Sequence, residues 1–170
     1  MAKGQAERLV PLLEELLAEA GITWADLCAI GVGTGPGNFT GVRISVALAR
    51  GLALGLGIPA VGVTALEALA LGVPRPVTVM IDARRDEVYQ QTFTDTGNGL
   101  ARIIATDAAH SNVTGTVIGA GGMAPQYALA EAIARITQTR WQQTQPRPAP
   151  FYLRGADAAP PSDPPPVILP

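Results

Sequence analysis

Four glycines and a proline join a predicted buried strand to a predicted helix within residues 33–43. Glycine adopts positive φ without strain and lets another backbone, a phosphate or a partner chain come close. The segment therefore predicts a tight turn built for close approach, with Thr40 capping the helix that follows. The residues of this predicted turn are Gly35, Pro36, Gly37, Asn38, Phe39, Thr40 and Gly41.

The turn has two interpretations. Backbone N–H groups and a helix N-terminus attract anions, which favours a phosphate site. However, no Lys-Ser or Lys-Thr pair follows, and Pro36 stands where a dinucleotide-binding turn has its third glycine. We therefore favour a turn used for packing or for docking a partner over one that binds nucleotide directly. Arg43 would serve either purpose.

Composition limits the function classes. The chain has 170 residues, of which 48% are hydrophobic and 15% are charged, and its formal net charge is −2. This predicts one compact domain or two small lobes that hide some surface against a partner, and it argues against a nucleic-acid site of the chain's own. Cys28, the single cysteine, lies in an apolar segment and is expected to be a buried, inert thiol. We expect a cytoplasmic protein with no membrane association.

The first half of the sequence predicts alternating helices and strands. Residues 5–20 show an amphipathic helical period, residues 27–33 form a strand apolar on both faces, and residues 41–56 form a helix rich in small residues that should be covered on more than one side. A strand at 59–63 and a third helix, opened by Thr64 and Glu67 as a capping box, follow. This order predicts an α/β fold with parallel strands.

The second half changes character at residues 74–76, Pro-Arg-Pro. Strands are expected at 77–81, 88–93, 100–105 and 116–119, and a helix begun by a proline at 125–137. The predicted organisation is a first lobe over residues 1–73, a second, smaller α/β lobe over 74–145, and a proline-rich tail over 146–170 in which residues 151–153 pack back on the body.

The sequence offers no complete catalytic constellation. The charged residues at 82–87 are expected to be a solvated hairpin tip. His110 is the single histidine, so a metal site with several His or Cys ligands is not expected. Ser45 lacks the Gly-x-Ser-x-Gly elbow of a hydrolase.

Three segments together resemble the bacterial TsaB (YeaZ) family: residues 35–43, the hairpin at 82–89, and Tyr152-Leu153-Arg154. The resemblance implies an actin-like, RNase H-like (ASKHA-type) two-lobe fold and a noncatalytic scaffold in the synthesis of threonylcarbamoyladenosine beside the anticodon of tRNAs that read codons beginning with A. It implies that a TsaD homologue carries the metal and the chemistry, that the TsaE ATPase drives turnover, and that tRNA is contacted only indirectly. This chain would then need no cofactor, because ATP and metal belong to its partners.

In the family, the first two helices pair with the equivalent helices of TsaD or of a second copy. The resemblance therefore implies a partner interface that includes Leu9, Leu12, Leu13, Leu16, Arg43, Ala47 and Arg50. Family members also begin with three strands before this first helix, so we expect the first lobe to be truncated and Met1 to be an internal methionine. Three alternatives stay open: a glycoprotease-like peptidase, a nucleotide-dependent actin-like enzyme, and a homodimeric interaction module.

Overall fold

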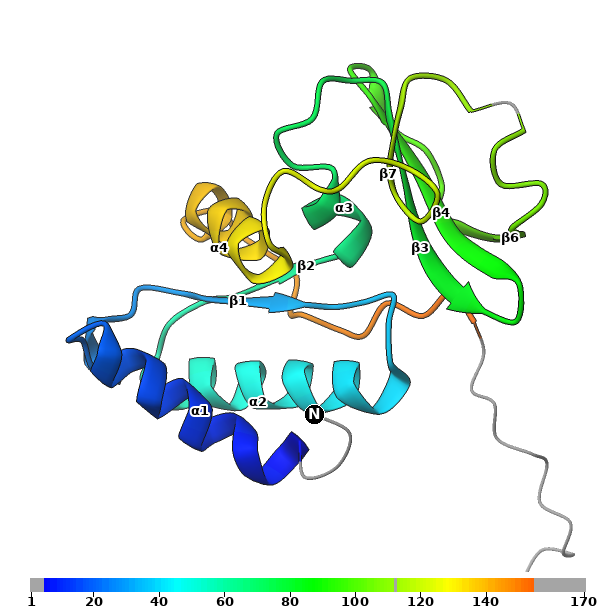
Figure 1. Cartoon of the computed structure of the whole chain (residues 1–170). Coiled ribbons are helices and arrows are strands. Elements are labelled where there is room, and N and C mark those ends of the chain that lie inside the picture. The colour runs from blue at the N-terminus through cyan, green and yellow to red at the C-terminus, as the bar shows by residue number, and fades with distance from the viewer. Residues whose placement is uncertain (1–4, 112, 155–170) are drawn as a thin grey trace, which may run out of the picture.

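The computed structural model describes residues 5–111 and 113–154 (Figure 1). Its elements alternate between helices and strands in the first part and are mainly strands in the second. In order they are α1 (Gln5–Glu19), η1 (Trp24–Asp26), β1 (Ile30–Gly33), α2 (Phe39–Leu56), β2 (Ala60–Val63), α3 (Ala65–Leu69), β3 (Val77–Arg84), β4 (Glu87–Thr94), β5 (Gly97–Asn98), β6 (Arg102–Ala105), β7 (Thr116–Gly119) and α4 (Leu129–Arg140).

The strands form two sheets. In the first, β1 and β2 are parallel, with Ile30 beside Ala60, and α2 is the crossover between them. In the second, the order is β5-β4-β3-β7, with β6 also paired to β4 and β7 parallel to β3. A parallel pair needs a crossover that returns the chain to the same end of the sheet. The α/β class is confirmed.

The first sheet lies between two helical layers (Figure 1). α2 covers one face, with α1 lying diagonally beside it, while α4 packs against β1 and β2 and also contacts α3. α4 thus comes from the later part of the chain yet covers the earlier sheet. The lobe boundaries at residues 73 and 145 stay a prediction, and the structure adds that the chain returns to the first sheet after completing the second.

The hydrophobic core has separate clusters on the two sheets. One joins α3 to the second sheet through Leu66, Val79 and Phe93, all almost fully buried. Another joins β2 to α4 through Val61 and Ile136. α3 belongs to both sides, because its Ala68 packs into the second cluster while Leu66 packs into the first. This short helix therefore connects the two sheets.

Two predictions about the first strand are wrong. β1 is shorter than the apolar run and starts at Ile30, and only Val32 among its residues is fully buried. Cys28 precedes the strand and is exposed, so it is not a buried thiol. Among the described residues β1 pairs with β2 alone, so its other edge has no paired strand beside it.

The cap of α2 differs from the prediction. The helix starts at Phe39, and the side chain of Asn38 accepts a hydrogen bond from the backbone N–H of Gly41 at 2.8 Å. Thr40, the expected cap, is an exposed residue of the first turn. Asparagine and threonine cap a helix by the same kind of bond, so residue preference alone did not distinguish them.

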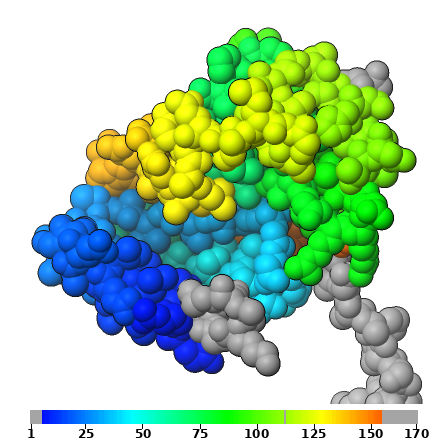
Figure 2. Space-filling view, viewed as in Figure 1, coloured from blue at the N-terminus to red at the C-terminus, as the bar shows by residue number. Residues whose placement is uncertain are grey.

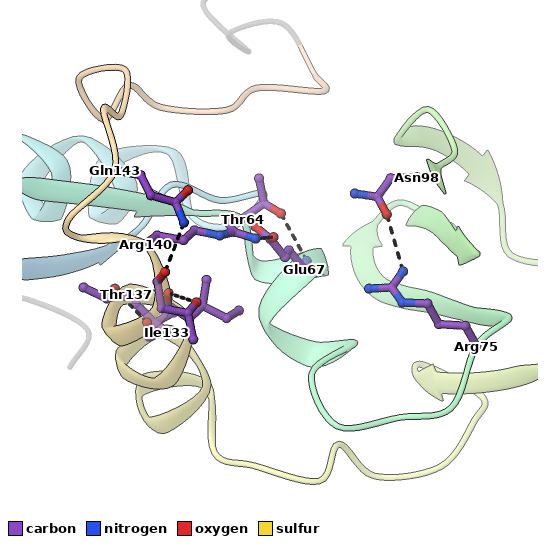
Figure 3. A network of polar contacts seen from close by, with 10 residues as sticks. Thr64, Glu67, Arg75, Asn98, Ile133, Thr137, Arg140 and Gln143 are labelled. Atoms are coloured by element: carbon purple, nitrogen blue, oxygen red, sulfur yellow. Dashed lines mark hydrogen bonds and ion pairs between the residues drawn. The ribbon is translucent and has the colours of Figure 1, made fainter. Parts of the chain in front are cut away.

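The other helices partly follow the sequence. At α3, the hydroxyl of Thr64 accepts from the N–H of Glu67 as predicted, but the Glu67 carboxylate pairs with Arg140 of α4 instead of closing the capping box (Figure 3). α4 begins at Leu129 and not at Pro125, so that prediction is wrong. Similarly, β6 begins at Arg102, which leaves Leu100 outside the strand and 92% exposed.

Replacing Asn38 by alanine should lower the free energy of unfolding by about 1 kcal/mol, because the N–H of Gly41 loses its acceptor. Thermal or urea unfolding of the purified chain measures the effect. Thr40→Ala is the matched control and should change stability by less than about 0.5 kcal/mol. A larger loss in Thr40→Ala than in Asn38→Ala would contradict the observed cap.

Candidate partner-docking site

One stripe of α2 is buried and the opposite stripe is bare. Val46, Ala49 and Ala53 are buried on the side that faces the first sheet. The residues exposed on the other side follow a helical period and are mostly small or apolar: Arg43, Ala47, Arg50, Gly51, Leu54 and Gly55. We call these six residues the bare face of α2. The expected cover on more than one side is therefore not seen in the described part of the chain.

The glycines of the bare face are not required by the packing of this chain. A Cβ built at Gly51 or at Gly55 would meet nothing within 4 Å. Leu54, between them, is 84% exposed. Glycine inside a helix costs about 0.5–1 kcal/mol relative to alanine. Small residues at this face would let a second helix approach closely, because the distance between packed helices is set by the side chains at their contact.

α1 adds apolar surface beside the bare face. Leu9, Leu12 and Leu13 are half-buried, and Leu16 is 52% exposed. An apolar hollow of about 230 Å³ lies between α1, η1 and β1. Its lining residues include Leu13, Leu16, Leu17 and Trp24. Figure 2 shows α1 and α2 side by side on one side of the molecule. The two helices that carry the predicted interface residues are therefore neighbours, and that these residues form one interface stays a prediction.

Two carboxylates in this region, one on α1 and one in η1, accept hydrogen bonds from nearby residues. On α1, Arg8 donates to Glu15, which lowers the pKa of the Glu15 carboxyl and raises the pKa of Arg8. At η1, the hydroxyl and the N–H of Thr23 both donate to Asp26 and lower its pKa. Both carboxylates are exposed, so these pairs orient side chains more than they stabilise the fold.

The glycine turn is used for packing within the chain. Gly35 has a φ of 99°, and a Cβ there would lie 3.1 Å from the carbonyl oxygen of Phe151. Its own carbonyl accepts from the N–H of Ala65 at 2.7 Å, at the start of α3. Gly35 and Pro36 are buried, whereas Gly37 and Asn38 are exposed. That the exposed part of the turn docks a partner or lies near a nucleotide stays a prediction.

Residues 146–154, which we call the strap, cover this turn without forming a helix or a strand. The N–H of Phe151 donates to the carbonyl of Thr34 at 2.8 Å. Further on, Arg154 forms an ion pair with Glu87 at the start of β4. The strap thus runs from the first sheet to the second, which confirms that the predicted segment at 151–153 packs back on the body.

Arg43 holds the strap from the bare face of α2. Its guanidinium lies 3.8 Å from the centre of the Phe39 ring, and its Nε donates to the hydroxyl of Tyr152 at 2.8 Å. The rings of Phe39 and Tyr152 are 4.9 Å apart. Arg43 therefore already has contacts within the chain. Tyr152 lies over one hundred positions later in the sequence, so no local pattern could predict that it contacts Arg43.

The chemistry-bearing residues are not brought together. Among the described residues, no group of three or more His, Cys, Asp or Glu could hold a metal ion. The hydroxyl of Ser45 donates to the carbonyl of Val42 in its own helix. His110 is exposed and lies between β6 and β7, where it approaches Gly121.

The comparisons with known proteins identify the family. The family model described as "TsaD: tRNA N6-adenosine threonylcarbamoyltransferase" matches residues 1–159. An uncharacterized protein of Mycobacterium tuberculosis (strain H37Rv) is 36% identical over 171 residues, which covers 94% of this chain and 79% of that protein. The chain belongs to the TsaD/TsaB (YeaZ) family. It is also 39% identical to the tRNA threonylcarbamoyladenosine biosynthesis protein TsaB of Escherichia coli over 99 residues, covering 55% of this chain and 43% of TsaB.

Solved structures agree with this membership. A Pseudomonas aeruginosa protein described as similar to peptidase YeaZ superposes with a TM-score of 0.65 and 26% identity, over 91% of this chain and 86% of that one. YeaZ from Pseudomonas aeruginosa gives a TM-score of 0.54 and 31% identity, over 68% of this chain and 59% of that one. The two-lobe α/β fold implied by the resemblance is confirmed.

Truncating Tyr152 should loosen the strap, because Arg43 loses a hydrogen-bond acceptor and Phe39 loses a ring contact. In Tyr152→Ala we expect hydrogen exchange at the N–H of Phe151 to become about 10-fold faster, since such contacts contribute about 1 kcal/mol or more. Tyr152→Phe keeps the ring and should show a smaller increase. Equal exchange in the wild type and in Tyr152→Ala would contradict the role given to Arg43.

Proposed function

We propose that the protein is a noncatalytic scaffold subunit that binds a TsaD homologue, in the complex that forms threonylcarbamoyladenosine in tRNA. The observation that carries the proposal is the bare face of α2, which combines exposed apolar side chains with glycines that have no packing role within the chain. The leucine stripe of α1 extends this surface. A helix pair from a related fold would bury both.

The names of the relatives support separate roles for this chain and for TsaD. The Escherichia coli relative is named as a protein of tRNA threonylcarbamoyladenosine biosynthesis, whereas the matching family model is named after the transferase TsaD. Two members of one family present similar helices, so a heterodimer would pair like surfaces around a pseudo-two-fold axis. In this proposal the metal, ATP and the transfer reaction belong to the TsaD and TsaE partners, and tRNA reaches this chain only through them, in the cytoplasm.

α2 also has the length and composition of a membrane-spanning helix, and 17% of it is buried. Two features favour a protein partner over lipid. Arg43 and Arg50 both lie on the bare face, where a bilayer would have to accommodate their charges. The opposite stripe is committed to the first sheet through Val46 and Ala49, so the helix cannot leave without exposing that core.

Two alternatives follow from specific observations. A Pseudomonas aeruginosa structural neighbour is described as similar to a peptidase, which favours a hydrolase. Against it, Ser45 donates to its own helix, and His110 lies between two strands of the other sheet. The second alternative is a homodimer through the same bare face, which the small residues would equally permit.

Ala47→Glu should weaken binding to the TsaD homologue at least about 10-fold, because it places an unpaired carboxylate in the centre of the proposed contact. Co-elution on a sizing column with light scattering, followed by calorimetric titration, measures this. Ala108→Glu introduces the same change at an exposed residue beyond β6 and should bind like the wild type. Equal binding by both variants would contradict the proposal that the bare face of α2 contacts the TsaD homologue.

The same logic applies to α1. Leu12→Glu should weaken the complex, whereas Leu100→Glu, at a 92% exposed position between β5 and β6, should not. Light scattering on the wild type alone separates the homodimer from the heterodimer: a dimer that persists unchanged after the TsaD homologue is added would favour the homodimeric module.

The function itself is tested by reconstitution. We expect threonylcarbamoyl transfer to tRNA to require this chain together with the TsaD homologue, and we expect Ala47→Glu to abolish transfer while Ala108→Glu retains it. Transfer that proceeds equally without the chain would refute the scaffold role. Hydrolytic activity of the purified chain that survives repeated separation would favour the peptidase.

A further inference from the structure

A cavity of about 430 Å³ opens between the C-terminal half of α2, the start of β2 and the beginning of the strap. Its floor is apolar and includes Ala53, Ile58 and Pro148, of which Ala53 and Pro148 are fully buried. A volume of this size is typical of small-molecule sites, which span roughly 300–1,000 Å³. The glycine turn, which the sequence singled out, does not line it.

Two arginines border this cavity from different elements. Arg50 comes from α2 and Arg147 from the strap. Within the described residues, neither forms an ion pair, whereas Arg140 pairs with Glu67 and Arg154 with Glu87. The side chains lining the cavity include no carboxylate among those described. In a chain of net charge −2, two arginines without carboxylate partners at one cavity are a local concentration of positive charge.

The chemistry of the lining selects a class of ligand. A guanidinium offers a planar set of N–H donors that matches a carboxylate or a phosphate. Gln145, also in the lining, adds an amide that can donate or accept. The apolar floor favours a ring over a flexible polar chain. We propose that this cavity binds a small organic anion in which a flat apolar ring carries a phosphate or carboxylate group.

The site adjoins the proposed docking face without coinciding with it. Arg50, Gly51 and Leu54 belong to both the cavity and the bare face of α2, whereas Ile58 and Arg147 belong to the cavity alone. Variants at Arg147 therefore probe the ligand with least effect on docking. The experiment uses the chain by itself, so its outcome does not depend on whether a TsaD homologue binds.

The probe is phenyl phosphate, titrated by calorimetry and by chemical-shift changes. We expect saturable binding with a Kd of about 1 mM or tighter. Arg147→Gln should weaken it about 10-fold, since a hydrogen bond to a charged group contributes about 1.5 kcal/mol or more. Arg84→Gln is the charge-matched control at the exposed hairpin tip and should leave binding unchanged.

A second pair of variants tests the cavity itself. Gly51→Leu projects a side chain into the lining and should abolish binding, whereas Gly55→Leu, one helical turn further and outside the lining, should leave it intact. Neither change creates a clash in the chain, because a Cβ at either position meets nothing within 4 Å. Folding of both variants is checked by thermal unfolding.

Benzoate, inorganic phosphate and phenol separate the parts of the proposal. Benzoate binding with the same dependence on Arg147 supports the shared anion chemistry and shows that phosphate is not required. Equal affinity for phenol and phenyl phosphate would overturn the role of the arginines. Equal affinity for inorganic phosphate and phenyl phosphate would overturn the role of the apolar floor. No saturable binding of phenyl phosphate or benzoate up to about 10 mM would overturn the site.

Discussion

The parallel pairing of β1 with β2 is the constraint on which the rest of the structure depends. A parallel pair cannot be joined by a hairpin, so α2 must cross from one strand to the next over a face of the sheet. A helix in that position buries only the stripe that meets the strands. The opposite stripe then needs either polar residues or a partner, and this sequence supplies mostly small and apolar ones beside Arg43 and Arg50.

The connections between the two sheets are few and partly charged. Leu66 and Ala68 of α3 enter different core clusters, while Glu67 between them pairs with Arg140 of α4. The strap makes a second connection through its ion pair with the start of β4. Both ion pairs are partly buried, so removing one member would leave a charge in a poorly hydrated place. The position of one sheet relative to the other therefore depends on residues that no local sequence motif identifies.

The proposed docking face and the proposed ligand cavity share one helix but differ in chemistry. The bare face of α2 suits another helix, because its small residues permit close approach. The cavity beside it suits a small anion, because two arginines surround an apolar floor. The strap joins these features: it is held by Arg43 on one side and contributes Arg147 on the other. Movement of the strap would change both surfaces together.

The sequence by itself determined the local features, because their signals come from neighbours in the chain. The hydrophobic period located α1, the glycine turn and a run of small residues located α2, and turn residues located the β3–β4 hairpin. Short motifs indicated the family. Only the tertiary structure decided which surfaces are covered and which side chains meet. The exposure of Cys28, the contact of Arg43 with Tyr152, and the meeting of Arg50 with Arg147 at one cavity depend on the assembled fold. Helical period shows which residues share a face, but whether that face is covered depends on packing partners that can lie a hundred residues away.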